Sequence, residues 1–342
     1  MLSSKFRGTL VGANIGDCLG APYEMDFKTS KLVIKNYITF LKEGKAKQVY
    51  KYTDDTAMTR SIAVSLITCK ELDCHDLAER FQKEYFNEPH RGYGENIKNV
   101  FIDLRDRKYE DVFESARQQF QGSGSYGNGA AMRVSPIPLF SLNDEDKLIK
   151  VATDVAKITH SNQLAITGSV LLALALKLVL CKKPGDSINP QNFIEGLIEK
   201  IRIIDTPTKV NKISEKTQVY VDSLIKILKY INNDCDPHIG SVVKDLGNEV
   251  SAHRSVPTAI YAFLRGLTPI DGIEENNIFV RVLYYCLLLG GDTDTIASMA
   301  GSLAGAYCGF TEIPDNLVSC CESIGVAISQ ANDLYSIHEN NV

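Results

Sequence analysis

Helical periodicity runs through most of this 342-residue chain and limits its fold more than any other feature. Apolar residues recur at intervals of three and four, as on one face of an α-helix. Strand-like alternation is almost absent. Only residues 32–40 (LVIKNYITF) form a β-branched and aromatic run, for which we expect a loop or a short hairpin arm. The predicted helices cover residues 53–68, 77–87, 143–157, 167–182, 192–203, 219–231, 258–264 and 277–289.

Small residues recur inside the helical patterns, as in GTLVGANIGDCLGA, GNGAAMR and ASMAGSLAGAYCG. A glycine inside a helix costs up to about 1 kcal/mol relative to alanine, so several together indicate helices that approach one another closely. No Pro/Gly/Ser linker divides the chain, and its most polar stretches, residues 43–51 and 184–191, are predicted surface loops. We therefore predict a compact all-α fold with a single domain over residues 1–342, with two helical subdomains as the alternative.

Composition argues against several classes of protein. The net charge is −5 without a dense basic cluster, so sequence-independent nucleic-acid binding is not expected. The longest apolar stretch, residues 166–181, is interrupted by Lys177 and is too short to cross a bilayer comfortably, so we expect a buried helix and no membrane partner. Nine scattered cysteines without a C-x-x-C pair, and no recognisable secretory signal, predict reduced thiols in an intracellular compartment.

The first candidate for chemistry is KYTDDTAM, in which Thr53, Asp54, Asp55 and Thr56 begin an amphipathic helix. Thr and Asp are preferred N-caps, and acidic residues in a first turn suit the helix dipole, so capping alone explains the segment. A single cap, however, needs only one side-chain oxygen, and four consecutive residues offer oxygen ligands here. Taken by itself, the segment leaves both interpretations open.

The downstream segment GGDTDT, residues 290–295, again places four oxygen-bearing residues at the start of a helical pattern. Together the two segments would concentrate four carboxylates, which repel one another unless cations neutralise them. Carboxylate and hydroxyl oxygens without a His or Cys cluster suit Mg²⁺, Mn²⁺ or Ca²⁺ and not Zn²⁺. A pair of metal ions is a familiar use of so many carboxylates.

Two further segments are glycine-rich. In FQGSGSYGNGAAMR, residues 120–133, a loop precedes another predicted helix, and such a loop can turn successive N–H groups toward an anion. It is neither a Walker A nor a Rossmann sequence, and a plain flexible loop is the equal alternative. In FRGTLVGANIGDCLGAPYEMD, Glu24 follows a helix end predicted at Pro22, where a lone glutamate is ordinarily a solvated surface residue.

In this order, the four segments resemble the ADP-ribosylglycohydrolase family, whose pattern runs GxxxGDxxGxxxE, TDDTxM, GNGAAMR and GGDTDT. The segments YTDDTAM, RGYG, GSYGNGAAMR, TH, SVPTAIY and LGGDTDTIASMAG are most similar to the branch that acts on ADP-ribosyl-serine. The resemblance covers residues 6–307 and is thin at residues 28–50 and 184–235. In one departure, LGNEV stands where close relatives have LGNG, which places Glu249 beside Val250.

The resemblance implies an all-α orthogonal bundle with two Mg²⁺ ions as cofactors. The metal ligands that it implies are Glu24, Thr53, Asp54, Asp55, Asp292, Asp294 and Thr295. The ADP-ribose contacts that it implies are Asp54, Gly92, Phe120, Ser123, Gly124, Ser125, Tyr126, Gly127, Asn128, Gly129, His160 and Val250. Within this set the pyrophosphate would lie on the glycine-rich loop, helped by His160, and the adenine between Phe120 and Val250. The candidates for proton transfer are Glu24, Asp54, Asp55 and Asp292.

The resemblance also implies a reaction. We expect release of ADP-ribose from serine in proteins, with poly(ADP-ribose) and O-acetyl-ADP-ribose as further substrates, through an oxocarbenium-like transition state. Gly16, Gly20 and Pro22 bracket a segment expected to open and close with Glu24. An ADP-ribosyl-arginine hydrolase and a non-catalytic ADP-ribose-binding or structural relative are the alternatives.

The expected partners are ADP-ribosylated proteins and small molecules that contain ADP-ribose, without direct nucleic-acid binding. A monomer is expected. The resemblance further implies a role in the DNA damage response and a location in the nucleus and cytoplasm, with the mitochondrial matrix as a third compartment.

Overall fold

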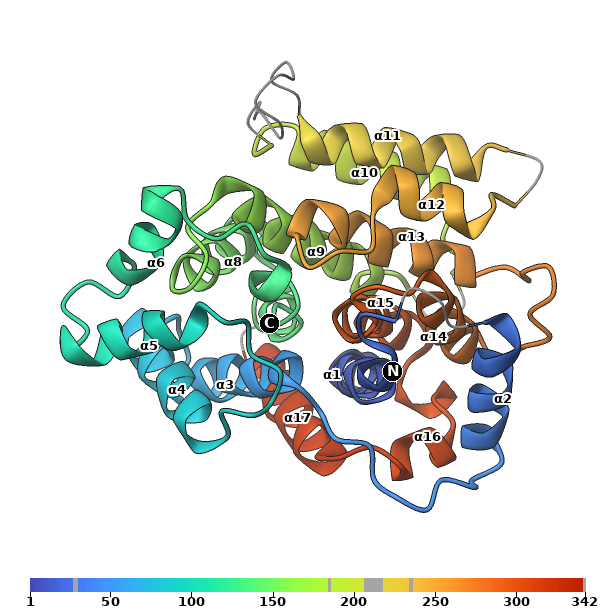
Figure 1. Cartoon of the computed structure of the whole chain (residues 1–342), viewed down its shortest axis with the longest axis horizontal. Coiled ribbons are helices and arrows are strands. Elements are labelled where there is room, and N and C mark those ends of the chain that lie inside the picture. The colour runs from blue at the N-terminus through green and yellow to red at the C-terminus, as the bar shows by residue number, and fades with distance from the viewer. Residues whose placement is uncertain (27–29, 184–185, 206–217, 234–235, 341–342) are drawn as a thin grey trace.

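The computed structural model describes residues 1–26, 30–183, 186–205, 218–233 and 236–340. Every regular element in these ranges is a helix, so the predicted all-α fold is confirmed (Figure 1). The α-helices are α1 (Leu2–Gly20), α2 (Lys31–Lys42), α3 (Asp54–Cys69), α4 (Cys74–Asn87), α5 (Ile97–Asp106), α6 (Glu114–Gln118), α7 (Pro136–Phe140), α8 (Glu145–Lys157), α9 (Gln163–Leu180), α10 (Pro190–Ile201), α11 (Val219–Ile231), α12 (Ile239–Leu246), α13 (Val256–Gly266), α14 (Ile278–Leu289), α15 (Thr293–Cys308), α16 (Asp315–Ser319) and α17 (Ile324–Asn340). Short 3₁₀ helices are η1 (Ala21–Tyr23), η2 (Gln119–Gly122), η3 (Asn128–Ala130), η4 (Ala252–Arg254) and η5 (Phe310–Glu312).

Helices α1 and α15 lie side by side at the centre of the molecule and pack through glycine (Figure 1). On α1 the glycines recur every four residues, at Gly8, Gly12, Gly16 and Gly20. A Cβ on Gly8 or Gly12 would lie 2.1 or 2.2 Å from a backbone carbonyl oxygen of α15, so no side chain fits between the helices. This close approach is the packing reason for the small residues that the sequence showed.

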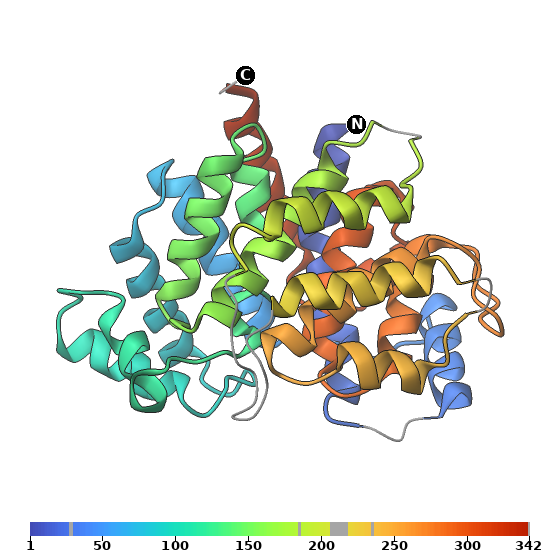
Figure 2. The same cartoon turned by 90° about the horizontal axis from the view of Figure 1, so that it is seen from above.

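The pairing is antiparallel, and it positions the candidate site. Gly8 faces Gly305 near the end of α15, whereas Gly20 faces Asp294 in its first turn. The end of α1, which leads to Glu24, therefore lies beside the start of α15. At the opposite end of α1, Phe6 contacts the ring of Tyr335 on α17, so α1 begins and α17 ends on the same side of the molecule (Figure 2).

All eight helices predicted from periodicity are present, with ends shifted by a few residues. The prediction for residues 32–40 was wrong, because this stretch belongs to helix α2. Its buried side chains are Ile34, Ile38 and Leu41, a helical stripe, and the Ser30 hydroxyl accepts the N–H of Val33 at the N-cap. Burial of one face against the fold outweighs the β-propensity of the branched residues.

The long apolar stretch forms α9, as predicted. This helix is long and apolar enough to cross a membrane, but 83% of it is buried among the other helices, which is the position of a core helix. Its one charged residue, Lys177, pairs with Glu145 at 3.1 Å at the edge of that core. We propose that residues 1–342 fold as one domain, since one cluster of buried apolar side chains includes residues from Phe6 to Leu334.

The structure also tests the two predicted surface loops and the helix predicted after the glycine-rich loop. Residues 43–51 form a loop between α2 and α3, as expected. In the stretch 184–191, residues 186–189 have no helix and Pro190 begins α10, while residues 184–185 lie outside the described residues. The prediction of a helix directly after the glycine-rich loop was wrong. The chain there forms only the 3₁₀ helix η3, and the next α-helix, α7, begins at Pro136.

Candidate metal centre and ligand-binding cavity

The N-terminus of α3 is capped without the carboxylates of Asp54 and Asp55. Buried Asp17 of α1 accepts the backbone N–H groups of Thr53 and Thr56 at 3.0 and 3.1 Å, together with the Thr53 hydroxyl at 2.8 Å. The N–H of Asp54 donates to the carbonyl oxygen of Arg91 at 2.6 Å. The backbone donors of this turn are thereby occupied, and the interpretation of both aspartates as simple caps no longer holds.

At the start of α15, too, the aspartate before the helix does not act as a simple cap. Asp292 precedes the helix, but its side chain makes no capping hydrogen bond; instead Oδ2 accepts the side-chain N–H of Asn128 at 2.5 Å. Gly290 and Gly291 have positive φ, and a Cβ on Gly291 would lie 2.1 Å from the carbonyl oxygen of Asn248, so only glycine fits this turn.

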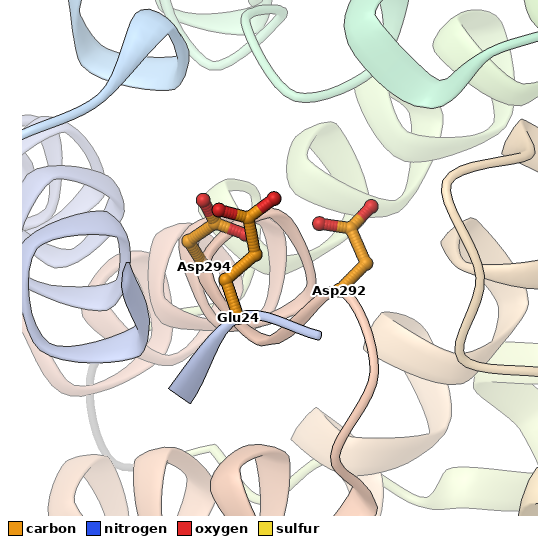
Figure 3. A group of neighbouring side chains, drawn as sticks. All are labelled: Glu24, Asp292 and Asp294. Carbon is orange, nitrogen blue, oxygen red and sulfur yellow. The ribbon is translucent and has the colours of Figure 1, made fainter. Parts of the chain in front are cut away.

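The acidic side chains from three segments converge. One carboxylate oxygen each from Glu24, Asp292 and Asp294 lies within 4.8 Å of the others, and Figure 3 shows the three groups turned toward one another. On the other side, the Thr295 hydroxyl donates to Oδ2 of Asp55 at 3.2 Å, which joins the starts of α3 and α15. The two oxygen-rich segments predicted to meet therefore do so.

The remaining threonines have different orientations. The Thr293 hydroxyl donates to the carbonyl oxygen of Gly20 at 2.9 Å, so it faces α1 and not the cluster. The Thr53 hydroxyl is engaged by Asp17, and Thr53 does not line the cavity described below, although it approaches Asp55 at 3.3 Å.

The clustered carboxyls hold their protons unusually tightly. Desolvation, followed by the charges of Asp17 and Asp292, raises the pKa of Asp54 to about 8. Desolvation and the neighbouring aspartates raise the pKa of Asp55 and of Asp294 well above the ordinary range. Burial, Asp292 and Asp17 also raise the pKa of Glu24. A divalent cation among these groups would remove the repulsion and let them ionise.

The donor set fits such a cation. Oδ1 of Asp55 is buried and has no hydrogen-bond partner among the described residues, which is an unusual state for a carboxylate oxygen. All the converging atoms are carboxylate or hydroxyl oxygens, the ligands that Mg²⁺, Mn²⁺ and Ca²⁺ prefer.

A cavity of about 350 Å³ opens next to the acidic cluster. Most of the predicted ligand contacts line it, namely Asp54, Gly92, Phe120, Ser125, Gly127, Asn128, Gly129, His160 and Val250. Ser123, Gly124 and Tyr126 do not line it. The Phe120 and Val250 side chains are 52% and 55% exposed, so they form a solvent-facing apolar rim.

Phe120 is held by an unusual backbone. Phe120 and Gln121 both have left-handed φ values, of 52° and 59°, followed by Gly122 at 87°. Two adjacent non-glycine residues in this region are strained, and such strain concentrates at binding sites. The result is an aromatic side chain directed away from the core.

The glycine-rich loop is only partly free to bind an anion. Four of its N–H groups already donate within the protein, those of Ser123, Gly124, Gly127 and Asn128. The N–H groups of Ser125 and Tyr126 have no acceptor in the part of the chain that the structure describes. Of these two residues only Ser125 lines the cavity, so its N–H is available for the predicted pyrophosphate contact, while the Asn128 side chain is occupied by Asp292 and Ser255.

His160 is 9% exposed, so it is not the surface histidine that was the alternative interpretation. Glu249, which departs from the resembled family, is exposed and pairs with Arg254 at 3.4 Å. Its charge is thus compensated on the surface beside Val250.

Two residues with structural importance for the site had no predicted role. Asp17 could have been noticed as the one charged residue in the small-residue stretch of α1. Arg91 begins the RGYG segment, but its role did not follow from the sequence, because two of its partners are distant along the chain. Its guanidinium stacks 3.8 Å above the Tyr52 ring and donates to Glu322 at 2.7 Å and Glu88 at 3.0 Å. This network holds the carbonyl that receives the N–H of Asp54.

A helical fold with an acidic cluster beside a glycine-rich loop is the arrangement expected of the resembled family, and the comparisons agree. The family model described as ADP-ribosylglycohydrolase matches residues 1–341, and the chain belongs to this family.

Among named relatives, ADP-ribosylhydrolase ARH3 of Xenopus tropicalis is 41% identical over 319 residues, which cover 92% of this chain and 89% of the relative. The protein of that name from Gallus gallus is 39% identical over 98% of this chain and 94% of its own. A solved structure described as an ADP-ribosylglycohydrolase-related protein complex superposes with a TM-score of 0.69 at 20% identity, covering 98% of both chains, and shares the fold.

Proposed function

We propose that this protein is a metal-dependent hydrolase that releases ADP-ribose from ADP-ribosylated serine in proteins. The observation that carries the proposal is the convergence of the Glu24, Asp292 and Asp294 carboxylates at a cavity that is also lined by the glycine-rich loop. The identity of 36–41% to proteins named ADP-ribosylhydrolase ARH3 supports it.

The cavity is lined by three kinds of group, each of which suits one part of ADP-ribose. The exposed rim of Phe120 and Val250 suits an adenine, because an aromatic ring can stack on a base. The N–H group of Ser125, which lines the cavity and has no acceptor among the described residues, suits the pyrophosphate. The acidic cluster is then left for the ribose that carries the bond to be cleaved.

The ligands proposed for two Mg²⁺ ions are Glu24, Thr53, Asp54, Asp55, Asp292, Asp294 and Thr295. Such ions would supply a positive charge for the ribose hydroxyls and lower the pKa of a water molecule. Asn128 and Thr295 orient the Asp292 and Asp55 carboxylates through hydrogen bonds of 2.5 and 3.2 Å. Orientation of this kind lowers the entropic part of the barrier.

We assign proton transfer to Glu24. Among the clustered carboxylates it is the exposed one, whereas Asp55 is held by Thr295 and Asp292 by Asn128. Burial and the charges of Asp292 and Asp17 raise its pKa, which favours uptake of a proton relative to an ordinary glutamate. The main chain supports its position, since the N–H of Met25 donates to the carbonyl oxygen of Gly291 at 2.7 Å.

Replacement of this group tests the assignment. We expect Glu24→Ala to lower kcat for ADP-ribosyl-serine peptide by about 10²- to 10⁴-fold, the usual contribution of a general acid or base. The matched control is Glu43→Ala, which removes an exposed glutamate at the end of α2. A Glu24→Ala protein with the turnover of the control would exclude both proton transfer and gating by this residue.

The gating itself remains a proposal, and the structure narrows where a hinge can lie. Gly16 and Gly20 are packed against Ala297 and Asp294 within or at the end of α1, so neither is free to act as one. Movement of Glu24 would have to begin beyond Gly20.

Substrate choice is tested by comparing serine-, arginine- and acetyl-linked ADP-ribose side by side, with Mg²⁺ and with EDTA. We expect the serine linkage to be cleaved fastest, and O-acetyl-ADP-ribose and poly(ADP-ribose) to be cleaved more slowly. In EDTA we expect no cleavage of any of these substrates. A higher rate on the arginine linkage would favour the alternative hydrolase. Binding of ADP-ribose without turnover of any linkage would favour a non-catalytic relative.

We also propose ADP-ribosylated proteins and small ADP-ribose conjugates as partners, a monomeric state, and a role in the DNA damage response. The nucleus, cytoplasm and mitochondrial matrix are the compartments proposed for it.

A further inference from the structure

Arg133 is a buried cation next to the cavity, and the proposed chemistry does not use it. Its side chain is 1% exposed and its guanidinium lies 4.5 Å above the Phe81 ring. Its Nη2 donates to the carbonyl oxygen of Val155 at 3.2 Å and to the Thr159 hydroxyl at 2.5 Å. Burying an arginine without a carboxylate partner is costly, so these hydrogen bonds need a reason.

The bond to Thr159 has a directional consequence. A guanidinium only donates, so Oγ1 of Thr159 accepts from Arg133 and its own proton must go elsewhere. The other polar atom within hydrogen-bond distance of Oγ1 is Nδ1 of His160, at 2.7 Å, and the direction of this bond depends on the tautomer of the ring. If Nδ1 accepts, a neutral imidazole carries its single proton on Nε2.

The two other states of the ring are disfavoured. If Nδ1 carried the proton, it would donate to Thr159, and the buried threonine hydroxyl would have no acceptor among the described residues. A doubly protonated ring is opposed by burial and by the charge of Arg133, which together lower the pKa of His160 to about 3. The peptide groups fix the geometry, because the N–H of His160 donates to Ala156 at 2.8 Å and Gln119 donates to the Thr159 carbonyl oxygen at 2.7 Å.

The free edge of the ring faces the glycine-rich loop. A Cβ on Gly129 would lie 3.2 Å from Nε2 of His160, and one on Gly127 would lie 3.4 Å from it. Nε2 has no partner among the described residues, and His160 lines the cavity together with Ser125 and Gly127. This largely buried ring therefore presents a single unused polar atom to the cavity, where the N–H group of Ser125 is also free.

We propose that Arg133 and Thr159 are positioning residues that hold His160 as a neutral ring with its proton on Nε2, so that it donates to an acceptor oxygen of the bound ligand. The identity of that oxygen, a phosphate oxygen of ADP-ribose, rests on the proposed function; the tautomer does not. The arrangement adds a donor to the free N–H group of Ser125, which lines the same cavity. It also gives a reason for glycine at position 129, where a Cβ would lie 3.0 Å from Cε1 of the ring.

The tautomer is measured directly in the ligand-free protein. ¹⁵N-labelled protein is examined by NMR spectra that correlate imidazole nitrogens with ring carbon-bound protons, with His160→Gln used to assign the His160 signals among the six histidines. We expect Nδ1 to have the shift of an unprotonated nitrogen and Nε2 that of a protonated one. Thr159→Val should change this signature, and Thr159→Ser, which restores the hydroxyl, should retain it.

Binding is measured on the same proteins by calorimetry with ADP-ribose. We expect Thr159→Val to weaken binding by about five- to tenfold, the effect of one misdirected hydrogen bond, and Thr159→Ser to bind within about twofold of the wild type. The matched control is Thr9→Val, which removes a buried hydroxyl from α1 whose only recorded bond is to the Lys5 carbonyl oxygen.

The outcomes separate the two proposals. A protonated Nδ1 in the wild type, or wild-type affinity in a folded Thr159→Val protein, overturns the positioning role. If the wild-type protein binds no ADP-ribose but shows the expected tautomer, the proposed ligand is wrong while the inference about the ring stands. Should Thr159→Val fail to fold, the wild-type spectrum and the Thr159→Ser affinity decide the question.

Discussion

Asp294→Asn is expected to abolish hydrolysis of ADP-ribosyl-serine, with a loss of about 10³-fold or more in kcat. The carboxylate of Asp294 lies in the cluster with Glu24 and Asp292, and its replacement by an amide removes one charge from the proposed metal site. The amide keeps the shape, so the fold should survive. Asp333→Asn, at an exposed position on α17, is the control for the amide substitution itself.

The same substitution should have an opposite effect on the stability of the metal-free protein. Because the pKa of Asp294 is raised by desolvation and by Asp55, its ionised form opposes folding, and the neutral amide removes that opposition. Without metal, the melting temperature of Asp294→Asn should therefore equal or exceed that of the wild type. Addition of Mg²⁺ should raise the melting temperature of the wild type and have little effect on the variant.

The pH dependence of the metal-free wild type follows from the same groups. In the folded protein the pKa of Asp54 rises from 3.8 to about 8, so the native state binds more protons than the unfolded state between these values. Stability without metal should therefore be highest at the acidic end of this window and fall as the pH rises through it.

Full turnover in Asp294→Asn, or an equal Mg²⁺ response of the melting temperature in the wild type and in Asp294→Asn, would remove the metal site from the proposal.

The second large effect is expected where α1 meets α15. Gly301→Ala would place a Cβ 2.3 Å from the carbonyl oxygen of Gly12, a contact that only a shift of one backbone can relieve. Overpacking usually costs 1–3 kcal/mol, and against a rigid backbone we expect about 4 kcal/mol or more, a value reached by few single substitutions. Urea unfolding and the yield of soluble protein measure this effect.

A matched glycine serves as the control. Gly196 lies inside α10, and no heavy atom lies within 4 Å of a Cβ built on it. Gly196→Ala should therefore stabilise the protein by about 0.5–1 kcal/mol, through the gain in helix propensity alone. If Gly301→Ala were tolerated as well as Gly196→Ala, the close approach of α1 and α15 would not be a determinant of stability.

Much of the fold could be predicted because helical periodicity is a local property. Residues 32–40 show the limit, since their branched residues favour a strand while the stripe of Ile34, Ile38 and Leu41 fits a helix. Only the buried partner surface decides between the two.

The meeting of the two oxygen-rich segments was predictable from charge. Several carboxylates without cationic neighbours indicate a cation, and this reasoning holds wherever the segments lie along the chain.

Which N–H groups of the glycine-rich loop are already used by hydrogen bonds within the protein was not predictable. The N–H of Asn128 donates to the Val250 carbonyl oxygen at 2.8 Å, and its side chain serves Asp292, so a residue expected on the phosphate instead connects the loop with the acidic cluster. Such bonds depend on folded geometry to within tenths of an ångström.

The antiparallel pairing of α1 with α15 has a consequence during synthesis of the protein. The hydrogen bond between Thr293 and Gly20 joins residues 273 positions apart. Helix α1, the first to be synthesised, therefore cannot pack against α15 until most of the chain has been made. At roughly 5–20 residues per second, a ribosome needs about 15–55 s to cover that distance. Throughout this time the glycine face of α1 has no partner, and Asp17 and Glu24 lack the aspartates of α15. Nascent chains therefore acquire the complete acidic cluster only near the end of translation.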